Sequence, residues 1–434
     1  MRKLFLPLFF IIFLFALIFT SCTSTSVSSE HIIQETQDII EEVISTQEQE
    51  PTPEPEPEPL KLTLTFGGDI MAHTQNFSMK NYSIIYENIE SIIKNDDLTF
   101  ANLEVPVHSG RPYENYPTFN VQPPYPEAAI SAGFDVFSLA NNHTNDQGLE
   151  GIEETLKFFT SKKDQDVYYA GIKSSTQENL SYQIIEKNGW KILFVAITEI
   201  LNQPAYKNRI DYIEPSKTKR EEFKLELKKL REENPCDLFI LSIHTCEDEY
   251  VHKITDLRRN LYKEYIENGV DIIWANHPHL AKEWEIISRK SQSEFNVTEN
   301  LPEQTNEIQP SALVMYALGN TISGQRRNPR FDAPETNRDY TGDGYLIQVE
   351  FEKPYDAQNI STDDAIKNPN FRITKITPHL ITTYIDPKLN YVIKLLNETF
   401  IQQLKDEGNL KWADYLLARK KLMDKIKGKE IIYE

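Results

Sequence analysis

The feature that most constrains the fold is a short apolar segment ending in polar side chains, a pattern that occurs five times in the chain. The clearest example is Asp237–His244, an almost wholly apolar run typical of a buried parallel strand. The other four are Lys61–Asp69, Leu98–Glu104, Phe134–His143 and Gly269–His279. Open α/β sheets place their sites just beyond the carboxyl ends of the strands. The sequence therefore predicts an α/β fold whose polar strand ends converge on one site.

These strand ends carry side chains that can coordinate a cation. Together they hold two carboxylates, an amide oxygen and up to four imidazoles: Asp69, Glu104, Asn142, His143, His244, His277 and His279. This mixture of ligands suits Mn²⁺, Fe²⁺ or Zn²⁺ better than Ca²⁺ or Mg²⁺. In an extended segment His277 and His279 project to the same side, so both can face one pocket. The pattern favours a divalent transition-metal site.

Each strand end also has an ordinary structural explanation. The stretch 132–148 could be a polar loop with an asparagine cap on the next helix. A lone His244 would more often be a hydrogen-bonded structural residue, and Asp69 could form a turn after two glycines. The coincidence of five such segments favours a site. Four histidines lack this support and are left out of the prediction: His31, His108, His252 and His379.

The remaining segments alternate between helical and strand patterns without an internal repeat. We expect helices at Tyr82–Lys94, Leu149–Phe159, Phe223–Arg231, Leu257–Glu267, Leu389–Leu404 and Leu410–Ile426. We expect further strands at Val167–Gly171, Trp190–Thr198, Ala312–Leu318, Gly344–Phe351 and Phe371–Thr377. Residues 288–310 are polar and are predicted to form a surface loop.

Two cysteines bracket one predicted strand and are interpreted as free thiols. Cys236 and Cys246 are separated by a run that spans roughly 30 Å when extended, which is too far for a disulfide. Cys246 follows His244 closely enough to be a minor candidate ligand.

Residues 1–22 are interpreted as a targeting segment. Arg2 and Lys3 precede the apolar run Leu4–Thr20, as in a signal peptide. The run ends in Phe-Thr-Ser-Cys, which resembles a bacterial lipobox with Cys22 as the lipidated residue. An ordinary cleaved signal and an uncleaved anchor are the alternatives. All three predict that the body of the protein is extracytoplasmic and lies at a membrane surface.

Residues 23–60 are predicted to be a disordered tether. They contain ten acidic residues and no lysine or arginine, which accounts for half of the net charge of −20. The alternation of proline and glutamate over Pro51–Pro59 predicts an extended spacer of polyproline type. The acidic balance argues against nucleic acid as a partner, since phosphate binding needs a basic face.

Five motifs together resemble the CapA (PgsA) family of poly-γ-glutamate capsule biosynthesis proteins. In chain order they are Gly67-Gly68-Asp69-Ile70-Met71, Ala101-Asn102-Leu103-Glu104, Leu139–His143 followed by Asp146 and Gly148, His277-Pro278-His279, and Tyr316-Ala317-Leu318-Gly319-Asn320. The resemblance covers roughly Leu62 to Gln325. It implies a fold similar to that of the calcineurin-like metallophosphoesterases, a four-layer α/β/β/α sandwich around a two-metal site. We expect this domain at 61–385, with a C-terminal helical extension at 386–434.

The resemblance also assigns roles to the candidate residues. Asp69 would bridge the metals, with a shell completed by Glu104, Asn142, His244, His277 and His279. His143, beside Asp146, would be the acid that faces the substrate. Asn141 and Asn320 are candidate substrate-binding residues. Apart from the resemblance, Arg326, Arg327 and Arg330 could receive the anionic groups of a substrate, and the alternative for them is a solvated loop.

Three departures from the phosphoesterase pattern favour one tightly bound metal over two. Met71 stands where the phosphoesterases have a histidine, and His73 comes two residues later. Glu104 replaces an aspartate. The segment after His244 lacks the Trp-Gly-x-Glu pattern of many relatives, although Glu249 can be aligned with its glutamate.

Two functions are compatible with this pattern. The first is a metal-dependent hydrolase or transferase acting on an anionic envelope polymer such as poly-γ-glutamate, with one or two Mn, Fe or Zn ions. The second is a non-catalytic accessory that binds nascent polymer or subunits of a membrane synthase, which the missing histidine favours. A solute-binding lipoprotein, a third interpretation, gives no reason for four imidazoles at strand ends.

Overall fold

The computed structural model describes residues 58–176, 179–288, 311–355, 370–426 and 428. The predicted targeting segment with Cys22, nearly all of the predicted tether and most of the predicted loop at 288–310 lie outside these residues. The described residues from 58 onward form one compact unit. Within the described residues, no helix is both long enough and apolar enough to cross a membrane.

The first sheet has eight strands in the order β14-β13-β12-β1-β2-β3-β4, with β11 paired to the end of β1. Its parallel half runs from β1 to β4, and β12, β13 and β14 pair antiparallel. The bounds are β1 (Leu60–Ile70), β2 (Leu98–Leu103), β3 (Val136–Ser138), β4 (Tyr168–Ala170), β11 (Asn320–Ile322), β12 (Asp343–Lys353), β13 (Arg372–Ile385) and β14 (Tyr391–Leu395).

The second sheet has six strands in the order β5-β6-β7-β8-β10-β9. Four central strands are parallel, and β5 and β9 pair antiparallel at the edges. The bounds are β5 (Tyr182–Lys187), β6 (Trp190–Thr198), β7 (Leu238–His244), β8 (Ile272–Asn276), β9 (Trp284–Ser288) and β10 (Ser311–Met315). Its central strands are buried on both faces, which explains why β7 is apolar almost to its last residue.

The two sheets pack face to face through large aromatic side chains. Phe100 of the first sheet lies 5.6 Å, between ring centroids, from Phe194 of the second. Phe66 lies 6.0 Å from Trp274 in the same way. The indole Nε1 of Trp274 donates a hydrogen bond of 2.8 Å to the carbonyl of Gly67. This contact joins β8 to the end of β1, which carries the first candidate ligand.

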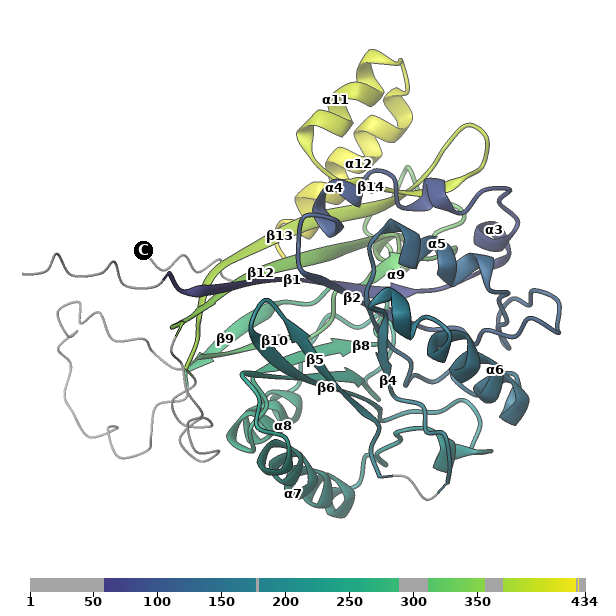
Figure 1. Ribbon diagram of the computed structural model, residues 1–434. Helices are drawn as coiled ribbons and strands as arrows, with labels where there is room; N and C mark the ends of the chain where they lie inside the picture. The colour runs from purple at the N-terminus through teal and green to yellow at the C-terminus, as the bar shows by residue number, and fades with distance from the viewer. Residues whose placement is uncertain (1–57, 177–178, 289–310, 356–369, 427, 429–434) are drawn as a thin grey trace, which may run out of the picture. The chain divides into compact units, whose positions relative to one another are not determined.

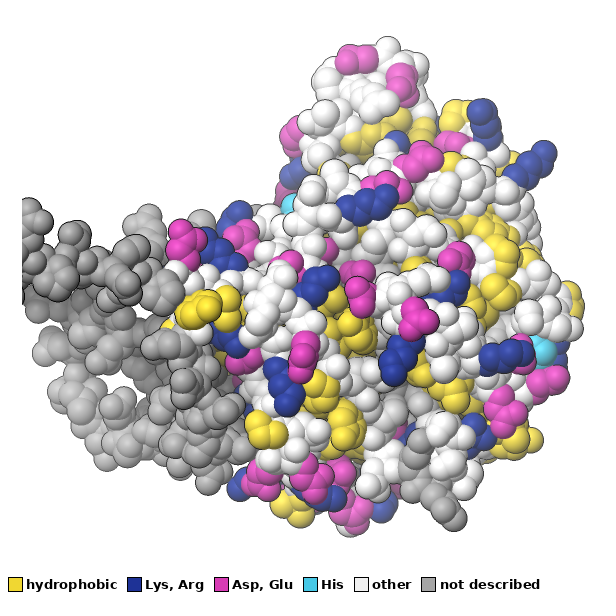
Figure 2. Space-filling view, in the orientation of Figure 1, with side chains coloured by type: hydrophobic (Ala, Val, Ile, Leu, Met, Phe, Trp, Pro, Cys, Tyr) yellow, Lys and Arg dark blue, Asp and Glu magenta, His cyan; other side chains and the backbone are white. Residues whose placement is uncertain are grey.

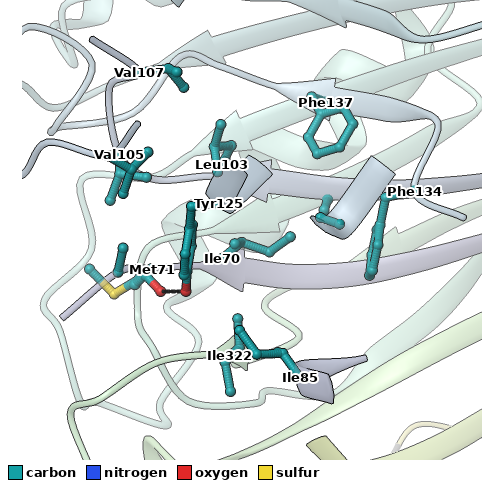
Figure 3. Close-up of a cluster of buried hydrophobic side chains, with 14 of the residues drawn as sticks. Ile70, Met71, Ile85, Leu103, Val105, Val107, Tyr125, Phe134, Phe137 and Ile322 are labelled. Carbon is teal, nitrogen blue, oxygen red and sulfur yellow. Dashed lines mark hydrogen bonds between the residues drawn. The ribbon is translucent and has the colours of Figure 1, made fainter. Parts of the chain in front are cut away.

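Helices cover the outer faces of both sheets (Figure 1). They are α5 (Pro124–Ala132) and α6 (Gly148–Thr160) on the first sheet, and α7 (Lys217–Glu233) and α8 (Asp256–Glu267) on the second. Figure 3 shows part of the first outer core, where Tyr125 packs among Ile70 and Leu103 and its hydroxyl donates to the carbonyl of Met71 at 2.7 Å. The four layers confirm the predicted α/β/β/α sandwich.

Shorter helices and a C-terminal pair complete the described elements: α3 (Thr74–Phe77), η1 (Ser83–Ile85), α4 (Glu90–Ile93), η2 (Lys163–Gln165), η3 (Lys207–Arg209), α9 (Asn337–Tyr340), α11 (Glu398–Asp406) and α12 (Leu410–Met423). The predicted helix at 82–94 is broken into η1 and α4. The segment contains five isoleucines, and β-branched residues have low helix propensity.

The predicted helix at 389–404 is wrong in its first half. Tyr391–Leu395 forms β14 and pairs antiparallel with β13, as expected for a run of aromatic and β-branched residues. Helix α11 starts only after Asn397, whose side chain accepts a hydrogen bond from the Phe400 amide. The first sheet therefore extends beyond residue 386, where the helical extension was expected to begin.

A buried charge cluster ties α12 to the first sheet. Asp343 of β12 is fully buried and accepts hydrogen bonds from Arg326 at 2.7 Å and from Arg419 at 2.6 Å. Arg419 belongs to α12, so the carboxylate joins two distant parts of the chain.

Replacing Asp343 with alanine is expected to destabilise the protein by about 3–5 kcal/mol, because two guanidinium groups would stay buried without their counter-charge. Urea denaturation followed by circular dichroism measures the change. Asp332→Ala is the matched control, since Asp332 pairs with Arg330 on the exposed surface. The control should leave the unfolding midpoint almost unchanged. Equal effects of the two substitutions would contradict this role for Asp343.

Candidate metal centre

The candidate ligands lie at the carboxyl ends of parallel strands from both sheets. Asp69 of β1 pairs in register with Asn102 of β2 on one side and with Asn320 of β11 on the other. Gly68 makes this possible, because a Cβ there would lie 1.9 Å from the carbonyl oxygen of Gly319. His244 is the last residue of β7 and pairs with Asn276, the last residue of β8.

One group of ligand atoms centres on His244. Its Nε2 lies 2.8 Å from Oδ1 of Asn142 and 3.1 Å from Nδ1 of His277. Ligand atoms that bind one ion at about 2.1 Å lie about 3 Å from one another. These three residues, which come from β7 and from the loops after β3 and β8, therefore have the spacing of a shared coordination sphere.

A second group centres on His279. Its Nδ1 lies 3.1 Å from Oδ2 of Asp69 and 3.1 Å from Oδ1 of Asn320, and its Nε2 lies 3.6 Å from Oε1 of Glu104. The same Glu104 oxygen lies 3.7 Å from Nε2 of His244. Glu104 therefore lies between the two groups and is the residue that they share.

Glu104 provides the clearest indication that a cation belongs here. Its side chain is fully buried, and within the described residues neither carboxylate oxygen has a hydrogen-bond partner. Burial raises its pKa well above the ordinary value, and the neighbouring Asp69 carboxylate raises it further. A buried carboxylate without partners is costly. A cation held between Glu104 and the imidazoles would satisfy it, so the donor set fits a metal.

Burial keeps two of the imidazoles in the form that a metal needs. Burial, together with the charges of neighbouring histidines, lowers the pKa of His277 to about 3 and that of His244 well below its ordinary value. Both rings are therefore neutral at physiological pH and have a lone pair available.

His279 behaves differently. Burial lowers its pKa, but the hydrogen bond to Asp69, the charges of Asp69 and Glu249 and the hydrogen bond to Asn320 together outweigh burial and leave the pKa raised. A carboxylate that accepts from one ring nitrogen orients the other nitrogen of a ligating histidine. In this geometry Asp69 positions His279 so that Nε2 faces Glu104.

The loop that carries His277 and His279 is not extended. His277 has φ 101° and His279 has φ 55°, values that residues other than glycine rarely adopt. The Tyr250 amide donates to the carbonyl of the intervening Pro278 at 3.0 Å. Both imidazoles reach the site as expected, but through left-handed backbone and not through the alternation of a strand. Such strain is typical of functional positions.

His143 lies beside the ligands with Asp146 behind it. Its Nδ1 is 2.6 Å from Oδ2 of Asp146, and that oxygen also accepts from the Phe119 amide at 2.8 Å. Asn202, which the sequence did not indicate, places its amide 3.3 Å from His143 Nδ1. Because Asp146 accepts the proton on Nδ1, Nε2 is the nitrogen left to exchange a proton with a substrate.

The predicted substrate-binding residues are largely engaged in the protein itself. Arg326 is 1% exposed and donates to Asp343, Thr382 and the Thr383 carbonyl. This contradicts its predicted role, because the guanidinium is not available to a substrate. Asn141 bonds to the Leu103 carbonyl and the His143 amide, and Asn320 lies against His279. Both hold the site together.

Two polar residues of this region were missed or given little weight. Asn102 donates to Asp69 and lies 3.3 Å from His244 Nδ1, so it joins the two sheets. Its position inside the Ala-Asn-Leu-Glu motif was the available signal. His73 is the other, and burial together with the nearby His279 lowers its pKa to about 3. Cys236 and Cys246 are free thiols, as predicted, and Cys246 contacts Arg220 and Arg258.

The fold and the site thus define an α/β/β/α sandwich with a candidate metal centre at its strand ends. Residues 63–325 match the family described as "Bacterial capsule synthesis protein PGA_cap". The chain belongs to this family, which confirms the resemblance found in the motifs.

Two relatives are capsule proteins of Bacillus. The chain is 26% identical over 273 residues to "Capsule biosynthesis protein CapA" of Bacillus anthracis, covering 60% of this chain and 59% of that protein. It is 24% identical over 356 residues to "PGA biosynthesis protein CapA" of Bacillus subtilis, covering 80% and 79%. Among solved structures it is similar to the calcineurin-like phosphoesterase YfkN from Bacillus subtilis, with 12% identity, a TM-score of 0.39, and coverage of 83% of this chain and 99% of that one.

Proposed function

We propose that this protein is a metal-dependent hydrolase or transferase that acts on an anionic polymer of the cell envelope during capsule synthesis. The observation that carries the proposal is the buried, unpartnered Glu104 carboxylate between imidazoles from both groups. The polymer class comes from the family and from relatives described as capsule and PGA biosynthesis proteins. Poly-γ-glutamate is the first substrate to test.

The ligands would be Glu104, His244, His277 and Asn142, with His279 and Asp69 on the other side of Glu104. A divalent Mn, Fe or Zn ion supplies a Lewis acid and lowers the pKa of a bound water. His143 donates a proton from Nε2 to the leaving group, and Asp146 holds the ring by its Nδ1–H.

The location of the protein is part of the proposal. Residues 1–22 would direct it out of the cytoplasm, and lipidated Cys22 would anchor it to the membrane with residues 23–60 as a spacer. The site would then meet polymer as it leaves a membrane synthase, whose subunits are the expected partners.

Metal analysis tests the proposal directly. We expect the purified wild-type protein to contain Mn, Fe or Zn, and His277→Ala to lose most of it. His108→Ala is the matched control, because His108 is a buried histidine that bonds to the Gly110 amide. The control should keep its metal. A metal-free wild-type protein would overturn the proposal.

One observation favours the accessory function as a second candidate. Met71 is buried in the hydrophobic core, and His73 Nδ1 accepts from the Gly324 amide, so neither replaces the missing phosphoesterase histidine in a direct way. Polymer length separates the two functions. An enzyme shortens or transfers poly-γ-glutamate only with metal, whereas an accessory retains the polymer at unchanged length with or without it.

A further inference from the structure

Basic residues on the face in view are interspersed with acidic ones, so that face offers no single-sign patch to an anionic chain (Figure 2). Most cations near the site are also paired: Lys282 with Glu247, Arg258 with Glu199 and Arg330 with Asp332. Arg327 and Arg338 differ, because both are exposed and neither forms an ion pair among the described residues.

A ring contact of Arg338 and the chain connection of Arg327 to Gly324 place these two arginines near the metal centre. The guanidinium of Arg338 lies 5.9 Å from the ring centroid of Tyr250, and Tyr250 lies 6.2 Å from the ring of His279. Arg327 follows Gly324 by three residues, and the Gly324 amide donates to Nδ1 of His73 at 3.2 Å. The two arginines and His73 therefore belong to one neighbourhood beside the ligands.

His73 contributes a neutral donor to this neighbourhood. Its Nδ1 accepts a hydrogen bond of 3.2 Å from the Gly324 amide, so the proton of the neutral ring resides on Nε2. Its ring packs edge-on against Phe119 at 5.2 Å, and Phe119 packs in the same way against His143 at 4.7 Å. Gly324 permits this approach, since a Cβ there would lie 2.6 Å from the His73 Cβ.

We propose that Arg327, Arg338 and His73 form the subsite that binds the anionic groups of the polymer and places its scissile bond at the metal centre. The two guanidiniums bind carboxylate or phosphate oxygens, and the Nε2–H of His73 donates to an oxygen next to His143. This rests on the proposed function, because it assumes that the polymer enters the same site.

The subsite is tested by measuring how tightly the full-length protein binds fluorescent poly-γ-glutamate. Binding is followed by the fluorescence anisotropy of the polymer. We expect Arg327→Ala and Arg338→Ala each to weaken binding about fivefold, and the double variant about 20-fold with a shallower salt dependence. Arg330→Ala is the matched control, an exposed arginine on the same segment that is already paired with Asp332. It should bind as the wild type does.

Two variants of His73 test whether its ring donates a hydrogen bond to the polymer. His73→Leu should raise KM for the polymer, whereas His73→Gln, which keeps a donor, should recover part of the loss. Metal content is measured for every variant and should not change. If the arginine variants bind as tightly as Arg330→Ala while the protein holds metal, the subsite is wrong and the proposed function stands. Equal losses in all three arginine variants would mean diffuse attraction and would also overturn the subsite. A wild-type protein without metal overturns the proposed function instead.

Discussion

Replacing Glu104 with glutamine is expected to abolish metal binding and yet to stabilise the metal-free protein. The wild-type carboxylate is fully buried without a hydrogen-bond partner and lies near Asp69. Without a cation, burial and the nearby Asp69 carboxylate disfavour the ionised form of Glu104, so the neutral amide should gain about 1–3 kcal/mol. With metal present the order reverses, because only the wild type gains the free energy of binding.

The pH dependence of this difference has a definite sign. The folded-state pKa of Glu104 is raised above 4.5, its ordinary value. Because the folded state holds its proton more tightly than the unfolded state, the metal-free wild type loses stability relative to Glu104→Gln as the pH rises above 4.5. Thermal unfolding of both proteins, with chelator and with added Mn²⁺, measures the effect. A metal-free Glu104→Gln protein that is less stable than metal-free wild type would contradict the role assigned to this carboxylate.

The second large effect is expected at His143. His143→Ala should lower the metal-dependent turnover of poly-γ-glutamate by about 10²- to 10⁴-fold, the usual contribution of a positioned acid or base. Metal content should stay at the wild-type level, because His143 belongs to neither ligand group. Asp146→Asn should give a smaller loss, since the ring keeps its place but loses the carboxylate that stabilises its charged form.

A distant buried residue provides the control for His143. Tyr262 is fully buried in the second outer core, and Tyr262→Phe should leave turnover unchanged. An unchanged turnover in His143→Ala would show that another group donates the proton. Loss of metal in that variant would instead assign His143 to the ligand shell.

Local patterns were sufficient to predict most of the strands and the position of the site. The apolar run that ends at His244 is typical of a strand buried on both faces, because both faces of such a segment must be covered by other parts of the protein. Polar residues at the ends of such strands must either find partners or form a site. This is why Asp69, Glu104, Asn142, His244, His277 and His279 could be named from the sequence, and why the structure brings them together.

Only the tertiary structure shows the backbone conformation of the two histidines, the burial of Arg326 and the strand at residues 391–395. The left-handed backbone at His277 and His279 depends on contacts such as the Tyr250 amide with Pro278. Arg326 is an arginine in a polar segment by sequence, yet β12 brings Asp343 against it and removes it from the surface. Residues 391–395 became a strand because the edge of β13 was available to them. Hydrogen bonds and burial between segments far apart in the chain determine these outcomes, and no local pattern records them.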